Sequence, residues 1–473
     1  MRFPQSRVSR RDEETVAVAD ADPGPTPLHA SRPAVPLQPE TREGFLAVLQ
    51  RRDFRFLWAA QAASQLADKF LVFTLLIFVY SISHRAFLTS LLMIAYTLPS
   101  VLLSAPAGVY ADRHDKRTLM IACNAIRAFL VLLIPIAQFV PGVAGQPWPL
   151  ILIMVLFSSA GQVFAPAEAA SIPSLVGRHQ ITQATSLFMT TVILTLVLGV
   201  PAATLAIGFA GNQAPFYIAA GLFALAALFV WRVHATLRAA RAKNAPAPSL
   251  IRELREGIAI LRASPALRLG LYQLALALVV VFTVFALGPV YLVEVLKRSD
   301  QDTYIVLVPA TFGLVAAAGV LGERKHFSRA LILVAAVFTA GVTLAFMGAL
   351  PVVLRHLNAF PLMTPFSVVL ALVFGGALGA VLIPAFTVLQ ERTTTESRGR
   401  IFGGIFTVIN AAVAVPLVAA GVLADIFGVD RVIGALGLLL IGLAIGVRML
   451  GWRQLAVLEE DGEAVSLSVV DPT

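Results

Sequence analysis

Apolar residues run in stretches of about 20 along most of the chain, and short polar segments separate them. A helix of that length crosses a hydrocarbon core of ~30 Å, whereas the alternating ten-residue pattern of barrel strands does not occur. The pattern predicts twelve membrane-spanning helices, at residues 56–82, 86–109, 118–140, 149–170, 182–207, 215–232, 268–296, 303–322, 329–350, 364–389, 401–424 and 431–450. We therefore expect an all-α membrane protein.

Composition agrees with the bilayer as the solvent of this chain. Of its 473 residues, 58% are hydrophobic and only 13% are charged. The net charge of +9 does not indicate nucleic-acid binding, because the basic residues lie at the ends of the apolar stretches. The single cysteine, Cys123, excludes an intrachain disulfide and a cysteine metal site.

Basic residues are distributed unevenly between the two sets of connections. The connections that follow the even-numbered spans carry three, one, eight, three and three Lys or Arg residues, eighteen in all, and the opposite set carries five. Cytosolic connections are the ones enriched in Lys and Arg. The bias predicts a multi-pass protein of the inner or plasma membrane with both termini in the cytosol.

The chain divides into five predicted segments. Residues 1–52 contain many prolines and no apolar period, and we expect a disordered cytosolic tail. Two six-helix halves, at 53–232 and 268–450, flank a cytosolic linker at 233–267 in which an amphipathic helix is expected. Residues 451–473 form a second predicted cytosolic tail.

An internal repeat supports the division into halves. Gly161-Gln-Val-Phe-Ala-Pro166-Ala closes the fourth span, and Gly379-Ala-Val-Leu-Ile-Pro384-Ala closes the tenth. Duplication of a helical unit is a recurring plan of transporters. The sequence therefore predicts two pseudo-symmetric bundles.

The turn between the second and third spans carries a glycine, an acid four residues later and a basic cluster. These residues are Gly108, Asp112, Arg113, Lys116 and Arg117. In this turn the chain resembles the major facilitator superfamily, whose members use the corresponding contact as a conformational latch between the two halves. Physically, a glycine permits close helix approach, and a carboxylate is stabilised near a helix N-terminus. A plain basic turn with a chance acid is the alternative.

Further motifs resemble the drug and siderophore exporters of that superfamily. They contribute candidate hinge or half-interface residues, namely Pro166, Glu168, Pro384, Gln390, Glu391, Arg398 and Arg400. The glycine-proline pattern of antiporters remains in the fifth span only as Gly199-Val-Pro201. The resemblance covers residues 50 to 450.

Charged residues inside the spans are rare because burying charge in hydrocarbon is costly, so each becomes a functional candidate. Asp68 and Lys69 lie in the first span and Arg127 in the third, at similar predicted depths. Asp68 paired with either cation is the predicted proton-sensitive element. A static ion pair that fixes helix packing is an equally good interpretation.

Uncharged polar residues mark a candidate substrate cavity, with a stripe in the first span at helical spacing. The candidates are Gln61, Ser64, Gln65, Asn124, Ser158, Gln162 and Asn410. Glu168 lies near the cytosolic end of its span, where an interfacial position is favoured over substrate binding, and Glu294 is expected at the outer rim.

The chain contains no phosphate-binding glycine loop, no His-Glu-x-x-His pair and no serine elbow. We therefore expect no enzyme activity, cofactor, metal or obligate protein partner. The sequence predicts a secondary transporter that exports a small amphipathic or apolar molecule, with protons as the coupling ion. A lysophospholipid or other lipid flippase fits the same pattern, and a non-transporting receptor or scaffold is the rival from another class.

Overall fold

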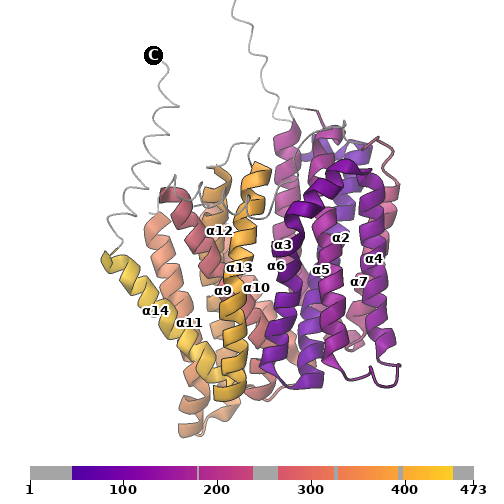
Figure 1. Ribbon diagram of the computed structural model, residues 1–473. Coiled ribbons are helices and arrows are strands. Elements are labelled where there is room, and N and C mark those ends of the chain that lie inside the picture. The colour runs from indigo at the N-terminus through magenta and orange to yellow at the C-terminus, as the bar shows by residue number, and fades with distance from the viewer. Residues whose placement is uncertain (1–44, 178–179, 238–264, 324–328, 392–397, 451–473) are drawn as a thin grey trace, which may run out of the picture. The chain divides into compact units, whose positions relative to one another are not determined.

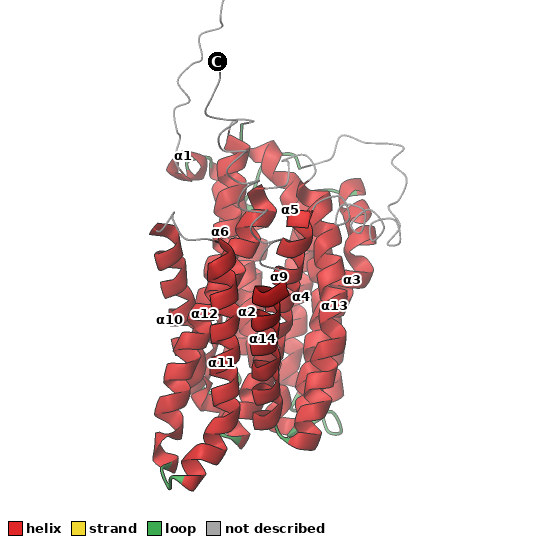
Figure 2. Cartoon of the chain, turned by 90° about the vertical axis from the view of Figure 1, so that its left-hand side faces the viewer, coloured by secondary structure: helices red, strands yellow, loops and turns green. Residues whose placement is uncertain are grey.

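The computed structural model describes residues 45–177, 180–237, 265–323, 329–391 and 398–450. The long helices in this part of the chain are α2 (Arg52–Ser83), α3 (Ala86–Arg113), α4 (Lys116–Ala137), α5 (Pro147–Leu175), α6 (Ile181–Ala210), α7 (Ala214–Trp231), α9 (Pro265–Glu294), α10 (Tyr304–Glu323), α11 (Arg329–His356), α12 (Met363–Glu391), α13 (Arg398–Phe427) and α14 (Val429–Leu450). No strand occurs among the described residues (Figure 2). The predicted all-α membrane fold is confirmed.

Helix boundaries follow the hydrophobic pattern closely. Eleven of the described helices are long and apolar enough to cross a membrane, and α10 contributes a shorter apolar stretch, Tyr304–Ala317. Most helices extend a few residues beyond the predicted spans. This extension is expected, because helical hydrogen bonding continues into the polar interfacial region of a bilayer.

The two predicted halves are visible as separate bundles, α2 to α7 and α9 to α14 (Figure 1). In the first, α3 packs on α5, and α4 packs on α5 and α7; in the second, α10 packs on α12, and α11 packs on α12 and α14. The same pairing pattern therefore recurs in both halves, as a duplicated unit requires. The halves meet where α3 lies along α9 and α13, and where α6 lies along α10.

Glycines let two helices of the second half approach closely. A Cβ at Gly348 of α11 would overlap the backbone of Gly434 in α14, and a Cβ at Gly437 would overlap that of Ala345. Small residues at such contacts allow backbone-to-backbone packing where lipid supplies no hydrophobic driving force. The close packing of α11 against α14 thus depends on these glycines.

The ends of the bundle are distinguished by where α2 begins and ends. We call the end with Arg52 and Arg113 the inner end, and the end with Ser83 and Ala86 the outer end. The charge bias predicts that the inner end faces the cytosol.

Several polar contacts join the halves toward the outer end. Asp425 of α13 accepts hydrogen bonds from the backbone N–H groups of Ala86 and Phe87, at 2.6 and 3.2 Å, at the start of α3. The Tyr80 hydroxyl of α2 donates to Glu294 of α9 at 2.9 Å, so Glu294 lies at the outer end as expected. In this structure the outer ends of the two halves are therefore held together.

One segment differs from the sequence-based expectation. Residues 45–49, inside the predicted disordered tail, form the short helix α1 (Phe45–Leu49), and Val48 is fully buried. The run Phe-Leu-Ala-Val-Leu is apolar enough to pack against the core, which the preceding residues are not. Residues 1–44, 451–473 and most of the predicted linker, 238–264, lie outside the described residues.

Candidate functional site

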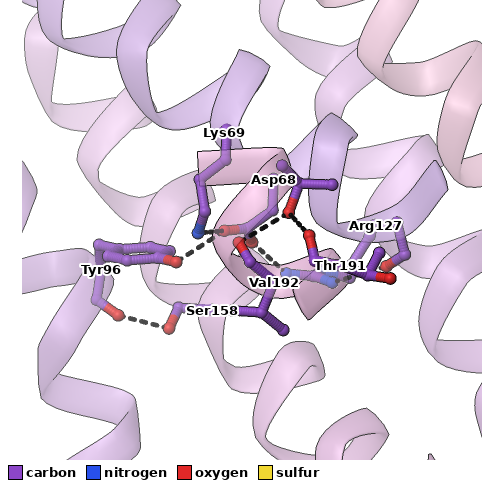
Figure 3. Close-up of polar contacts among 9 residues, drawn as sticks. Asp68, Lys69, Tyr96, Arg127, Ser158, Thr191 and Val192 are labelled. Carbon is purple, nitrogen blue, oxygen red and sulfur yellow. Dashed lines mark hydrogen bonds and ion pairs between the residues drawn. The ribbon is translucent and has the colours of Figure 1, made fainter. Parts of the chain in front are cut away.

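Asp68 lies at the middle of α2, a helix of 32 residues, and its side chain is almost fully buried. Its Oδ1 is 2.5 Å from Nη2 of Arg127 on α4. Its Oδ2 accepts from Nζ of Lys69 at 3.0 Å and from the hydroxyl of Tyr96 on α3 at 2.6 Å (Figure 3). Three donors from three helices thus converge on one carboxylate, and the expected pair of Asp68 and Arg127 is present.

The Arg127 guanidinium is held on several sides. Its carbon lies 4.2 Å from the ring centroid of Phe157 on α5 and 4.8 Å from that of Phe223 on α7. Such cation–π contacts are worth up to about 2 kcal/mol each when water is excluded. Gly161 of α5 leaves room for the Arg127 guanidinium, because a Cβ at this position would lie 3.1 Å from Nη2 of Arg127.

Two predicted cavity residues extend this network toward the inner end. Arg127 donates to the hydroxyl of Ser64 at 3.4 Å, and that hydroxyl donates to Oδ1 of Asn124 at 3.2 Å. Ser158 donates to the backbone carbonyl of Tyr96 at 2.5 Å and so fixes the segment that carries the tyrosine (Figure 3). We call Asp68, Lys69, Tyr96, Arg127, Ser64 and Asn124 the charge network.

Other predicted cavity residues are not brought into the charge network. Gln61 is buried and donates to the backbone carbonyl of Phe188 on α6 at 3.4 Å. Gln65 and Gln162 are half-buried, and neither forms a hydrogen bond with the network in the described part of the chain. Asn410 of α13 instead joins the two halves, since it donates to Ser100 of α3 at 2.7 Å.

The fifth-span glycine lies directly against the charge network. A Cβ at Gly199 of α6 would lie 2.6 Å from Cβ of Lys69. A side chain at this position would push Lys69 away from Asp68, since the neighbour is the rigid base of a side chain. The glycine of Gly199-Val-Pro201 therefore sets the separation of α2 and α6.

The predicted latch residues do not contact the second half among the described side chains. Asp112 and Arg113 are exposed, Lys116 is buried, and Arg117 donates to the backbone carbonyl of Trp231 on α7 at 2.5 Å. Close helix approach at Gly108 is absent here, because no atom lies within 4 Å of a Cβ built on it. The described contacts of this turn therefore lie within the first half, and the latch role stays a prediction.

The structure describes the side chains of only some of the candidate hinge or half-interface residues. Pro166 and Pro384 lie inside α5 and α12, at matching places in the two halves. Glu168 of α5 is only 7% exposed, and its position relative to the membrane interface stays a prediction. Four candidates lie at the end of α12 or the start of α13 with side chains outside the described residues, namely Gln390, Glu391, Arg398 and Arg400.

Residues 57–417 match the family model described as Major Facilitator Superfamily. The chain belongs to this superfamily. It is a multi-pass membrane transporter, and the small-molecule substrate and the bilayer are the partners that membership implies.

Curated relatives of this major facilitator transporter include efflux proteins. It is 24% identical over 399 residues to macrolide efflux protein A of Streptococcus pyogenes, covering 83% of this chain and 94% of the relative. It is 23% identical over 357 residues to the multidrug efflux pump Tap of Mycolicibacterium fortuitum, covering 74% and 83%. An uncharacterized MFS-type transporter of Bacillus subtilis, YvqJ, is 25% identical, covering 84% and 92%.

Solved structures share the fold of the transporter. The nucleoside transporter NupG aligns with a TM-score of 0.59 at 13% identity, covering 85% of this chain and 99% of that one. A bacterial homologue of the lysosomal transporter Spinster, in an inward-facing and unoccupied conformation, aligns with a TM-score of 0.59 at 14% identity, covering 83% and 94%. At these identities the likeness shows the architecture alone.

Sequence reasoning missed three members of the site, Tyr96, Phe157 and Phe223. A tyrosine inside an apolar span was the one available signal for Tyr96, since a buried hydroxyl requires a partner. The two phenylalanines are indistinguishable by sequence from the many others that pack or face lipid.

Proposed function

We propose that this transporter exports amphipathic or apolar small molecules in exchange for protons, with both termini in the cytosol. The observation that carries the proposal is the Asp68 carboxylate, which is buried at mid-helix and held by Arg127, Lys69 and Tyr96. A buried acid with dedicated cations is costly to maintain, and in membranes such groups mark ion pathways. Protonation of Asp68 would release both cations and loosen the contacts among α2, α3 and α4.

The placement of charge supports an apolar or amphipathic substrate. In the described helices of the second half, α9 to α14, every charged residue lies in the first or last turn. A site for a strongly charged substrate would need fixed ions or hydrogen-bonding groups deeper in both halves. The efflux relatives named above, for macrolides and for multiple drugs, support the same class of substrate and the outward direction.

Transport in proteoliposomes under an imposed pH gradient tests this proposal. The probes are a macrolide, a lipophilic fluorescent dye and a fluorescent lysophospholipid, with a hydrophilic sugar as the negative control. We expect flux of the macrolide or the dye that follows the gradient and stops when a protonophore collapses it. Flux of the lysophospholipid alone would instead identify a lipid flippase, and no flux of any probe would contradict the proposal.

Alternating access requires the outer contacts between the halves to break, and Asp425→Ala is expected to favour that opening. The substitution removes the acceptor of two N–H groups at the start of α3. Loss of a helix N-terminal cap costs about 1 kcal/mol, which corresponds to a shift of about fivefold in population. Spin labels at the exposed positions Arg85 and Phe427 would report the distance between α3 and α13.

Asp430→Ala is the matched control, because Asp430 lies at the start of α14 within the second half. The control should leave the distance distribution unchanged. An unchanged distribution in Asp425→Ala would show that this contact does not hold the outer end.

A further inference from the structure

Glu168 is a buried carboxyl that the charge network does not use. It lies on α5 between Phe164 and Ile172, both of which belong to the buried apolar cluster near the inner end. The residue is only 7% exposed, and its Oε1 has no hydrogen-bond partner among the described residues. A carboxyl that served only packing would carry a partner, because an unpaired buried acid is costly.

The position of Glu168 relative to Arg127 follows from α5 itself. Gly161 lies beside the Arg127 guanidinium, and Glu168 follows seven residues later on the same helix. At 1.5 Å per residue, Glu168 lies about 10 Å closer to the inner end than the guanidinium. Arg127 thus pairs with Asp68, and Glu168 lies on the adjacent helix on the inner side of that pair.

Unpartnered polar atoms continue from the ion pair toward the inner end. Among the described side chains, Nε of Arg127, Nδ2 of Asn124 and Oε1 of Gln61 are buried and have no hydrogen-bond partner. Asn124 lies one turn closer to the inner end than Arg127 on α4. Gln61 lies one turn closer to the inner end than Ser64 on α2. Buried polar atoms of this kind are the places where ordered water makes two to four hydrogen bonds.

We propose that Glu168 is a second proton-binding site, through which protons pass between Asp68 and the inner solution. In each step the O–H bond of the Asp68 carboxyl breaks, water carries the proton along Arg127, Asn124 and Gln61, and an O–H bond forms on the Glu168 carboxylate. Glu168 then releases the proton to the inner solution, and Asp68 returns to its ion pair. This inference rests on the proton coupling proposed above.

The surrounding charges fit a relay. On the helices packed against α5, the buried titratable groups are Asp68 and Tyr80 on α2 and Lys116, Cys123 and Arg127 on α4, and the half-buried Lys69 and Tyr96 belong to the charge network. Helix α6 carries no charged residue. Arg127 and Lys116 are thus the cations of α4 that can stabilise an ionised Glu168, and Arg127 also pairs with Asp68.

Infrared difference spectroscopy on the full chain in lipid nanodiscs tests proton binding directly. Acidification should produce the C=O stretching band of a protonated carboxylic acid in the wild type and in Asp68→Asn. We expect Glu168→Gln to lose the part of that band that persists in Asp68→Asn, so that the double variant Asp68→Asn/Glu168→Gln shows neither part. A band of unchanged size in Glu168→Gln would overturn the assignment.

Transport then tests the relay. Glu168→Gln should slow pH-gradient-driven flux by at least about tenfold, leave substrate exchange without a gradient within about twofold, and be partly rescued by Glu168→Asp. Equal loss of both activities would overturn the relay in favour of a packing or substrate-binding role. If the wild type shows no proton-driven flux, the coupling and the relay are both wrong, and the infrared band alone decides whether Glu168 binds a proton.

Discussion

Asp68→Asn is expected to abolish pH-gradient-driven export while the protein still folds and reaches the membrane. Asparagine has nearly the same shape, and its side-chain oxygen can still accept from Tyr96 or Lys69. It cannot bind or release a proton, so the charge at position 68 would no longer change during the transport cycle. Arg127 keeps its contacts with Phe157 and Phe223, which limits the cost of losing the anion.

The measurement combines protein abundance in the membrane with flux in proteoliposomes. Flux driven by the gradient should fall by about 100-fold or more, within the range typical for removal of an acid–base group. The control is Ser81→Ala, a polar change near the outer end of α2 that removes a hydrogen bond to the backbone carbonyl of Phe78 and lies outside the charge network. Flux near the wild-type level in Asp68→Asn would show that the pair only fixes helix packing.

Arg127→Gln is expected to lower the stability of the folded protein. The substitution leaves Asp68 buried with Lys69 and Tyr96 as its remaining donors, and it removes two cation–π contacts. Removal of one partner of a buried ion pair costs about 3–5 kcal/mol when an uncompensated charge remains, and because Lys69 still pairs with Asp68 we expect a loss near the lower end of that range. Thermal unfolding in detergent and the yield of folded protein would both report this loss.

The double variant Asp68→Asn/Arg127→Gln separates the two interpretations of the pair. It removes the Asp68–Arg127 pair together and leaves Lys69 as the remaining charge of the network, so part of the stability lost in Arg127→Gln should return. Its pH-gradient-driven flux should remain absent, because no proton-binding group is restored. Recovery of flux along with stability would contradict a coupling role and would support a static pair.

Much of the fold could be predicted from the hydrophobic pattern, because a bilayer dictates the length of a helix that crosses it. The span predicted at residues 86–109 is the helix Ala86–Arg113, and the repeat around Pro166 and Pro384 places matching prolines in α5 and α12. The pairing of Asp68 with Arg127 is predicted from their similar depths in the membrane, because opposite charges buried at the same depth in a helical bundle are stabilised by pairing.

The remaining features depend on side-chain packing that a single sequence does not encode locally. The fourth span is predicted to end at residue 170, whereas α5 continues to Leu175, and the burial of Glu168 depends on the helices that pack around it. The outer contact of Asp425 with the start of α3 joins residues 338 and 339 positions apart. No periodicity within one helix indicates such a contact.

The central claim is that protons move in exchange for substrate through the charge network. Its most direct test measures both movements at once: wild-type proteoliposomes without an imposed gradient receive substrate, and a pH-sensitive dye in the lumen follows protons. The account predicts proton movement opposite to the substrate in the wild type and none in Asp68→Asn. Substrate movement without protons in the wild type, or equal proton movement in Asp68→Asn, would contradict it.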